Sequence, residues 1–221
     1  MKMSFSSTIG MLISMGLASF SNMKSVTHHE SSNYASIDTI IKDIPCSKKG
    51  NPLNYYSLMK SAESETGFPT LVNGFDSIQI RIWYGYSNTI NDQVVILKNS
   101  DSKWSAEMFT LTNSLDKNKN SLSLFKKTSF TREPKSGWAF FLKRIYGLGI
   151  LTLPDDSQIP SYGSANDAGA IRVQISTLKK YRIYSYSSLF ANKSRIWQAR
   201  NMDQILRLIE REFSFNRLGT W

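Results

Sequence analysis

The chain has 221 residues, of which 41% are hydrophobic and 12% aromatic, and a formal net charge of +10. This composition suits a packed core and argues against a wholly disordered chain, and the length suits one domain with an N-terminal extension. A single cysteine, Cys46, excludes an internal disulfide. Basic and acidic residues balance at nine each through Glu107, so the whole excess, eighteen against eight, lies from Met108 onward. The C-terminal half therefore favours anionic partners.

The first residues are typical of an export signal. Lys2 gives a short basic start, Ile9–Phe20 is mostly apolar or small, and Ser19 and Ser21 suit the residues before a cleavage site. The apolar run is too short and too rich in serine for a membrane span of about 20 apolar residues. We therefore expect a signal peptide over 1–21, export to a periplasmic or extracellular location, and no transmembrane span. The alternative is a short hydrophobic segment that belongs to the core.

Residues 22–74 are expected to form a loosely ordered segment with short helices over 36–44 and 53–62. Alternation of apolar and polar residues then predicts strands, and the short turns between them indicate an antiparallel meander. The four predicted strands are Phe75–Tyr86, Gln93–Lys98, Lys103–Thr112 and Leu122–Thr131.

A helix capped by Ser136 follows the meander, and Leu151–Gly169 then forms a long irregular connection. Two more strands are predicted over Ala170–Thr177 and Tyr181–Tyr186. The order of elements predicts an α+β domain over 75–221, with a single mainly antiparallel sheet and helices packed on one face.

The C-terminal helix has the clearest pattern in the chain. Its apolar residues recur in steps of three and four, so they share one face. Asp203 and Arg207 are spaced for an ion pair on the helix surface. Asn192 is the favoured N-cap, and Asn201 with Gln204 is the alternative cap of a later start. The residues of the apolar stripe are Ile196, Ala199, Met202, Leu206, Ile209 and Phe213.

Most common catalytic arrangements are missing from the sequence. The only histidines, His28 and His29, lie near the N-terminus, which excludes a Ser-His-Asp or Cys-His site within the domain. Metal-protease, paired-cysteine, nucleophile-elbow and phosphate-loop motifs are absent. Two neighbouring histidines rarely form a metal site alone, so we predict no metal and no cofactor.

A carboxylate mechanism survives these exclusions. Asp155 and Asp156 lie in the long connection, with Tyr162 and Asp167 nearby, and long connections are often functional. Two carboxylates are the groups that a glycoside hydrolase requires. Adjacent aspartates in such a loop are, however, more often turn formers.

A second candidate site follows from strand alternation. Alternation makes one face of the sheet basic and aromatic if the apolar residues of three strands share the core face. Those core-facing residues are Ile78, Ile80 and Ile82, then Ile171, Val173 and Ile175, and finally Tyr181 and Ile183. Guanidinium groups and flat aromatic rings grip carboxylates or phosphates and stack on sugars. Arginine stems lying across aromatic rings also commonly finish a solvated sheet face. The residues expected on that face are Arg81, Trp83, Arg172, Gln174, Arg182, Tyr184 and Tyr186.

Several short motifs in the C-terminal half resemble a group of uncharacterised small exported bacterial proteins. The motifs are Ser136-Gly137-Trp138, the loop from Leu153-Pro154-Asp155 to Tyr162, Tyr181-Arg182-Ile183-Tyr184-Ser185-Tyr186, and Trp197-Gln198-Ala199 before the last helix. The likeness covers roughly Phe75–Phe213. It implies an exported α+β domain and assigns no catalytic residue.

These observations favour a non-enzymatic binding or interaction module of the cell envelope that uses the basic and aromatic sheet face. Its partner would be an anionic glycan, an envelope surface or an acidic protein. One alternative is a carboxylate-dependent hydrolase that acts through the 151–169 loop. Another is a basic protein associated with nucleic acid or with a membrane surface. Nucleic acid is disfavoured because no recognition motif accompanies the charge.

Overall fold

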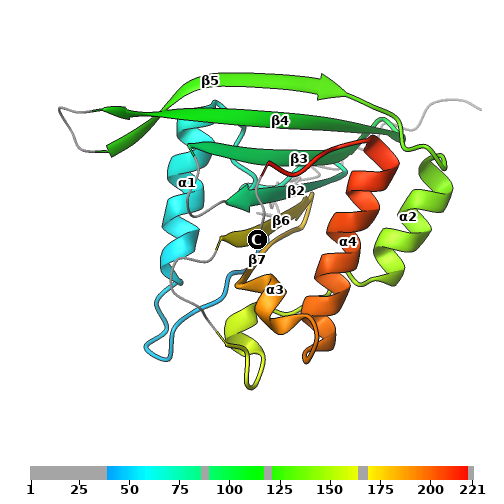
Figure 1. Ribbon diagram of the computed structural model, residues 1–221. Helices are drawn as coiled ribbons and strands as arrows, with labels where there is room; N and C mark the ends of the chain where they lie inside the picture. The colour runs from blue at the N-terminus through cyan, green and yellow to red at the C-terminus, as the bar shows by residue number, and fades with distance from the viewer. Residues whose placement is uncertain (1–38, 86–89, 117–120, 164–168, 219–221) are drawn as a thin grey trace, which may run out of the picture. The chain divides into compact units, whose positions relative to one another are not determined.

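A seven-stranded sheet forms the centre of the fold (Figure 1). The computed structural model describes residues 39–85, 90–116, 121–163 and 169–218. The strands are β1 (Ile41–Asp43), β2 (Ile78–Gly85), β3 (Asn91–Ser100), β4 (Lys103–Asp116), β5 (Ser121–Thr131), β6 (Ala170–Thr177) and β7 (Lys180–Ser187). The helices are α1 (Asn54–Thr66), α2 (Trp138–Gly147), α3 (Leu189–Asn192) and α4 (Trp197–Phe213), with a 3-10 turn, η1, at Asp156–Gln158.

The strands lie in the order β1-β7-β6-β2-β3-β4-β5. Every neighbouring pair is antiparallel except β1 and β7, which run parallel. The meander β2–β5 is confirmed, and β6 and β7 extend the sheet from the other side of β2. The predicted fold class, α+β with one mainly antiparallel sheet, is therefore confirmed.

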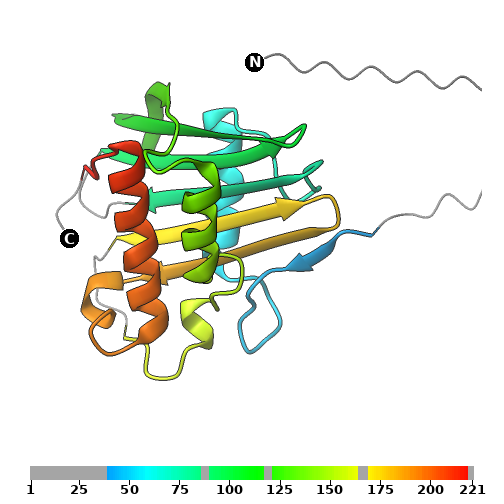
Figure 2. The same cartoon turned by 90° about the vertical axis from the view of Figure 1, so that its right-hand side faces the viewer.

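Helices α2 and α4 cover one face of the sheet side by side (Figure 2). Phe141 of α2 and Phe213 of α4 meet edge to face with ring centroids 5.0 Å apart, and both side chains are fully buried. The apolar stripe predicted for α4 is confirmed, because its residues from Ala199 to Phe213 lie in the core. The predicted ion pair between Asp203 and Arg207 is also present, at 2.8 Å. The pattern of the helix thus predicts its buried face correctly.

Both predicted helix caps are wrong. Gly137, with a φ of 78°, precedes α2 in place of a capping serine, and the Ser136 backbone N–H donates to the Glu212 carboxylate. Asn192 ends the short helix α3, and its side chain holds both the N–H and the C=O of Gly163. The Asn192 side chain is taken by Gly163, and α2 has no side-chain cap, because Gly137 stands between Ser136 and the first turn.

Helix α1 and the segment after it cover the opposite face of the sheet (Figure 2). Met59, Phe68 and Leu71 are buried there against side chains of β2, β3, β4 and β7. The expectation of helices on one face therefore holds for α2 and α4, while α1 forms a second layer. Because both faces are covered, six consecutive residues of β2 from Gln79 to Tyr84 are buried.

The structure also differs from the expected loose segment over 22–74. Residues 39–74 belong to the same unit as the sheet, and the helix predicted over 53–62 is confirmed as α1 and is longer. The helix predicted over 36–44 is wrong where the chain is described, because Ile41–Asp43 forms β1. The isoleucines there follow the helical period, and the pairing of β1 with β7 is a long-range contact that local spacing does not contain. The predicted signal peptide, 1–21, lies outside the described residues.

Candidate functional site

The predicted basic and aromatic sheet face does not exist as one surface. Gln174 pairs with Ile183 and Val173 pairs with Tyr184, so the register of β7 is opposite to the one expected. Tyr181 and Ile183 face α1 together with Trp83. The even-numbered residues Arg182, Tyr184 and Tyr186 lie on the other face, where both tyrosines are fully buried in the α2–α4 core. The shared face is therefore a wrong prediction.

Arg81 lies inside the protein beneath α1. Its Nη1 donates to Glu63 Oε1 at 2.9 Å and its Nη2 to the Pro69 carbonyl at 3.1 Å. The guanidinium also lies over the rings of Phe68 and Trp83, with its central carbon 5.1 and 5.9 Å from the centroids. Burial lowers the pKa of Arg81 to about 10, and the charge of Glu63 opposes this shift. Arg81 therefore holds α1 to the sheet.

Trp83 and Gln174 extend the same buried network. The Trp83 indole donates to Gln174 Oε1 at 2.8 Å, and Gln174 Nε2 donates to Glu63 Oε1 at 2.8 Å and lies 3.1 Å from the Tyr181 hydroxyl. All four side chains are at most 5% exposed. A ligand cannot reach these groups without displacing α1, so the network is structural.

The other predicted face residues also have internal partners or neighbours. Arg182 binds Asp43 Oδ2 and the carbonyls of Leu151 and Leu153, and the Tyr184 hydroxyl donates to the Ile150 carbonyl. Arg172 is half-buried, and burial lowers its pKa.

The guanidinium of Arg172 lies across Gly85 of the neighbouring strand. A Cβ added to Gly85 would lie 3.1 Å from Arg172 Nη1. The absence of a side chain at Gly85 therefore leaves space for the Arg172 guanidinium.

Asp155, Asp156 and Tyr162, the predicted loop site, lie together along the edge of β7. Asp155 Oδ2 accepts the Ser185 N–H at 2.8 Å, and Asp156 Oδ2 accepts the Ser187 N–H at 2.7 Å. The Tyr162 hydroxyl donates to the Ser187 carbonyl at 2.7 Å. Since β1 pairs with β7 only as far as Arg182, these side chains replace a neighbouring strand along the rest of the edge. Asp167 lies outside the described residues.

Further contacts occupy the two carboxylates. Asp155 also accepts the Tyr55 hydroxyl at 2.6 Å, which ties the start of α1 to the loop, and it caps η1 through Ser157. Burial raises the pKa of Asp156, and its hydrogen bonds to Ser187 oppose this shift. The acceptor capacity that a catalytic pair would offer to a substrate is thus largely taken by the protein's own donors.

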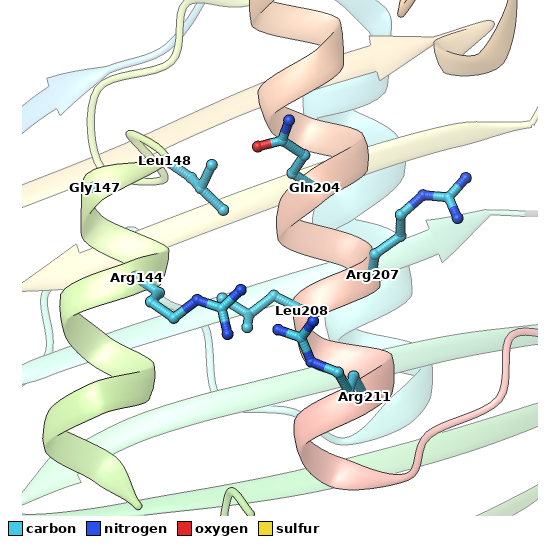
Figure 3. A pocket seen from close by; sticks show the side chains of 7 residues that line it. All are labelled: Arg144, Gly147, Leu148, Gln204, Arg207, Leu208 and Arg211. Atoms are coloured by element: carbon cyan, nitrogen blue, oxygen red, sulfur yellow. The ribbon is translucent and has the colours of Figure 1, made fainter. Parts of the chain in front are cut away.

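An open groove between α2 and α4 is the strongest candidate for a site (Figure 3). It has a volume of about 420 Å³, within the range of ligand pockets. Leucine side chains form its apolar part and arginines its rim. Its lining residues are Arg144, Gly147 and Leu148 from α2 and its end, and Gln204, Arg207, Leu208 and Arg211 from α4.

Two of the arginines face one another across this arginine groove. Figure 3 shows Arg144 and Arg211 extending toward each other with Leu208 between them, while Arg207 points away from α2. Both facing side chains lie near Glu212 Oε1, with Arg144 Nη1 at 3.7 Å and Arg211 Nη2 at 3.8 Å. These distances are too long for hydrogen bonds. Within the described residues, neither guanidinium donates a hydrogen bond, and the two arginine side chains are 40% and 58% exposed.

The electrostatics of the two helices reinforce this arrangement. Their acidic residues are buried or half-buried: Glu212 accepts the Ser136 N–H, and Asp203 accepts a hydrogen bond from Arg207, which raises the pKa of that arginine. The exposed charged residues of α2 and α4 are all basic: Lys143, Arg144, Arg200, Arg207 and Arg211. The outer face of the helix layer is therefore cationic.

Sequence reasoning missed the arginine groove although its signals were present. The excess charge lies in the C-terminal half, and Arg144, Arg207 and Arg211 each lie off an apolar stripe. Nothing in the local pattern says that α2 and α4 are neighbours, and the groove exists only between them.

Other kinds of site find less support. In the described part of the chain, no group of three or more histidine, cysteine or acidic residues is placed to hold a metal ion. His28 and His29 lie outside that part. None of the described helices is long and apolar enough to cross a bilayer. No protein-family model matches the chain, and a search of curated protein sequences finds no significant match.

Proposed function

We propose that the protein is a non-enzymatic binding module that holds an anionic group in the arginine groove between α2 and α4. The observation that carries this proposal is the convergence of Arg144 and Arg211 on one opening with unused donors. Guanidinium groups match phosphate and carboxylate oxygens in pairs. A single shared carboxylate, Glu212, leaves the two arginines with an excess of positive charge.

The groove is built on rigid parts of the fold. Leu208 is 2% exposed, and Phe141 and Phe213 fix the two helices against each other beneath the opening. The helix positions that carry the two arginines are thus fixed before binding, so that binding has to order only their side chains. The chain is further proposed to act outside the cytoplasm, on the basis of its N-terminal sequence. An exported module would meet phosphate- or carboxylate-bearing surfaces of the envelope.

The alternative of a carboxylate-dependent hydrolase has less support. Asp155 and Asp156 bind backbone and hydroxyl groups of β7, α1 and η1. Their arrangement is accounted for by the open edge of β7.

Calorimetric titration with pyrophosphate at low ionic strength tests the proposal. The double variant Arg144→Gln/Arg211→Gln should weaken binding by about tenfold or more, since each arginine supplies charge-assisted hydrogen bonds. The matched control is Lys143→Gln/Lys98→Gln, which removes two exposed charges that do not line the groove. Equal loss in both double variants would show that only net charge matters and would overturn the groove as a site.

A further inference from the structure

The outer face of the helix layer carries apolar groups beside its cations. Phe140 on α2 and Trp197 on α4 are 54% and 58% exposed. Phe140 lies one turn before Arg144, whose guanidinium carbon is 5.6 Å from the centre of the phenylalanine ring. Trp197 precedes Gln204 by seven residues, which places it on the groove side of α4. Both aromatic residues therefore flank the arginine groove.

The two aromatic residues lie at opposite ends of the groove. Asn201 Nδ2 donates to the Leu148 carbonyl, so the start of α4 lies beside the end of α2. Trp138 packs on Phe213 with ring centroids 6.0 Å apart, so the start of α2 lies beside the end of α4. The face thus presents an exposed aromatic ring at each end and arginines between them.

We infer that this face docks on the surface of an anionic lipid bilayer. A headgroup phosphate would occupy the arginine groove, so the inference rests on the proposed function, while Phe140 and Trp197 would enter the interfacial region. Exposed basic residues on a surface without exposed acids complement anionic headgroups. Aromatic side chains with an apolar body favour the membrane interface. A small soluble anion would use the arginines and leave the two aromatic residues without a role.

The charge of the face favours a membrane over a second copy of the chain. Five basic residues and no exposed acid lie on α2 and α4, so two such faces would repel each other. Each cation near an anionic surface contributes about fivefold to the affinity. The docking should therefore be strong in vesicles with anionic lipid and weaken as salt is added.

Sedimentation of the full chain with vesicles tests the inference. Vesicles of mixed phosphatidylglycerol and phosphatidylcholine are compared with vesicles of phosphatidylcholine alone. Phe140→Ser/Trp197→Ser should lower the affinity for the mixed vesicles by about tenfold or more, because two aromatic side chains no longer leave water. All variants share the same N-terminal residues, so any membrane affinity of that segment cancels in the comparison.

The matched control is Phe125→Ser/Leu178→Ser, which removes apolar side chains that are 74% and 57% exposed on β5 and in the turn between β6 and β7. It should change vesicle affinity by less than about twofold. Quenching of tryptophan fluorescence by brominated lipid provides a second readout. The quenching seen with the parent chain should be largely lost in Trp197→Phe. Unchanged quenching in that variant would overturn the inference.

The outcomes separate the inference from the proposed function. Two results together would overturn the membrane inference and leave the proposed function standing. Pyrophosphate binding would depend on Arg144 and Arg211, and Phe140→Ser/Trp197→Ser would not change the affinity for vesicles. A chain that forms a dimer in solution and does not bind vesicles would show that this face binds a second copy of the chain. Capture of an acidic protein without vesicle binding would likewise replace the lipid surface. If pyrophosphate binding does not depend on Arg144 and Arg211, both proposals are overturned.

Discussion

Glu63 of α1 and Arg81 of β2 form an ion pair at 2.9 Å whose side chains are 5% and 0% exposed. The same Glu63 oxygen also accepts a hydrogen bond from Gln174, and Arg81 gives a second hydrogen bond to the Pro69 carbonyl. An otherwise apolar layer between helix and sheet thus contains a charged pair with several partners. The pair fixes where α1 lies on the sheet.

Replacing Glu63 by glutamine should therefore destabilise the protein strongly. The substitution keeps the shape of the side chain and leaves the Arg81 guanidinium buried without a counter-charge. We expect the free energy of unfolding to fall by about 3 to 5 kcal/mol, measured by urea denaturation. Glu65→Gln, on an exposed position of the same helix, should change it by less than about 0.5 kcal/mol. Equal effects of the two substitutions would contradict the structural role of the pair.

Removal of the Asp155 carboxylate should expose the edge of β7. Asp155→Ala leaves the Ser185 N–H and the Tyr55 hydroxyl without their acceptor, and we expect a loss of about 2 to 3 kcal/mol of stability. Amide exchange at Ser185 should accelerate, which hydrogen exchange followed by NMR will measure. Asp76→Ala, in an exposed connection, is the control. If Asp155→Asn instead abolished a hydrolytic activity and left the stability unchanged, the loop would be catalytic.

Asp156 should make the stability depend on pH in a direction set by its burial. Its pKa is raised in the folded state, so the folded protein binds a proton more readily than the unfolded chain. This contribution to stability is fully present below the unfolded pKa and is lost as pH rises through the folded pKa. The free energy of unfolding of the parent chain, relative to that of Asp156→Asn, should therefore rise as pH falls from 7 to 4. Urea denaturation of both chains across that pH range measures this difference. A relative fall of the parent's free energy of unfolding as pH falls would contradict a raised pKa of Asp156.

The local patterns predicted the elements well and their long-range partners poorly. The alternation in β2 and the stripe of α4 come from neighbours within one element, so sequence spacing records them. The tyrosine strand β7 is different, because both of its faces are buried and carry tyrosines. With no contrast between the faces, alternation cannot decide which set points toward α2 and α4.

The candidate sites show the same limit. The sequence shows Asp155 and Asp156 as two acids in a long connection. That they bind the open edge of β7 follows only from the structure, in which the pairing of β1 with β7 ends at Arg182. The arginine groove requires two helices separated by about fifty residues of chain to lie side by side. No spacing within either helix contains that information.

The ends of α1 and α4 provide a matched pair of backbone tests. Ser214 follows α4 with a φ of 50°, and Gly67 follows α1 with a φ of 68°. The left-handed conformation is unfavourable for residues with a Cβ by about 1 kcal/mol. Ser214→Gly should raise the free energy of unfolding by about 0.5 to 1 kcal/mol, and Gly67→Ala should lower it by a similar amount. Thermal denaturation measures both, and changes of equal sign would contradict the explanation.

The pairing of β2 with β6 has a consequence for how the chain reaches its native state. Ile80 pairs with Ile175 at the middle of the sheet, and Ile41 at its edge pairs with Lys180. Such contacts give a high contact order, which slows folding because long loops must close before the pairs form. During synthesis, β2 remains an uncovered edge until the last quarter of the chain has been made. A chain that cannot complete its sheet early therefore stays open for longer before it reaches the native state.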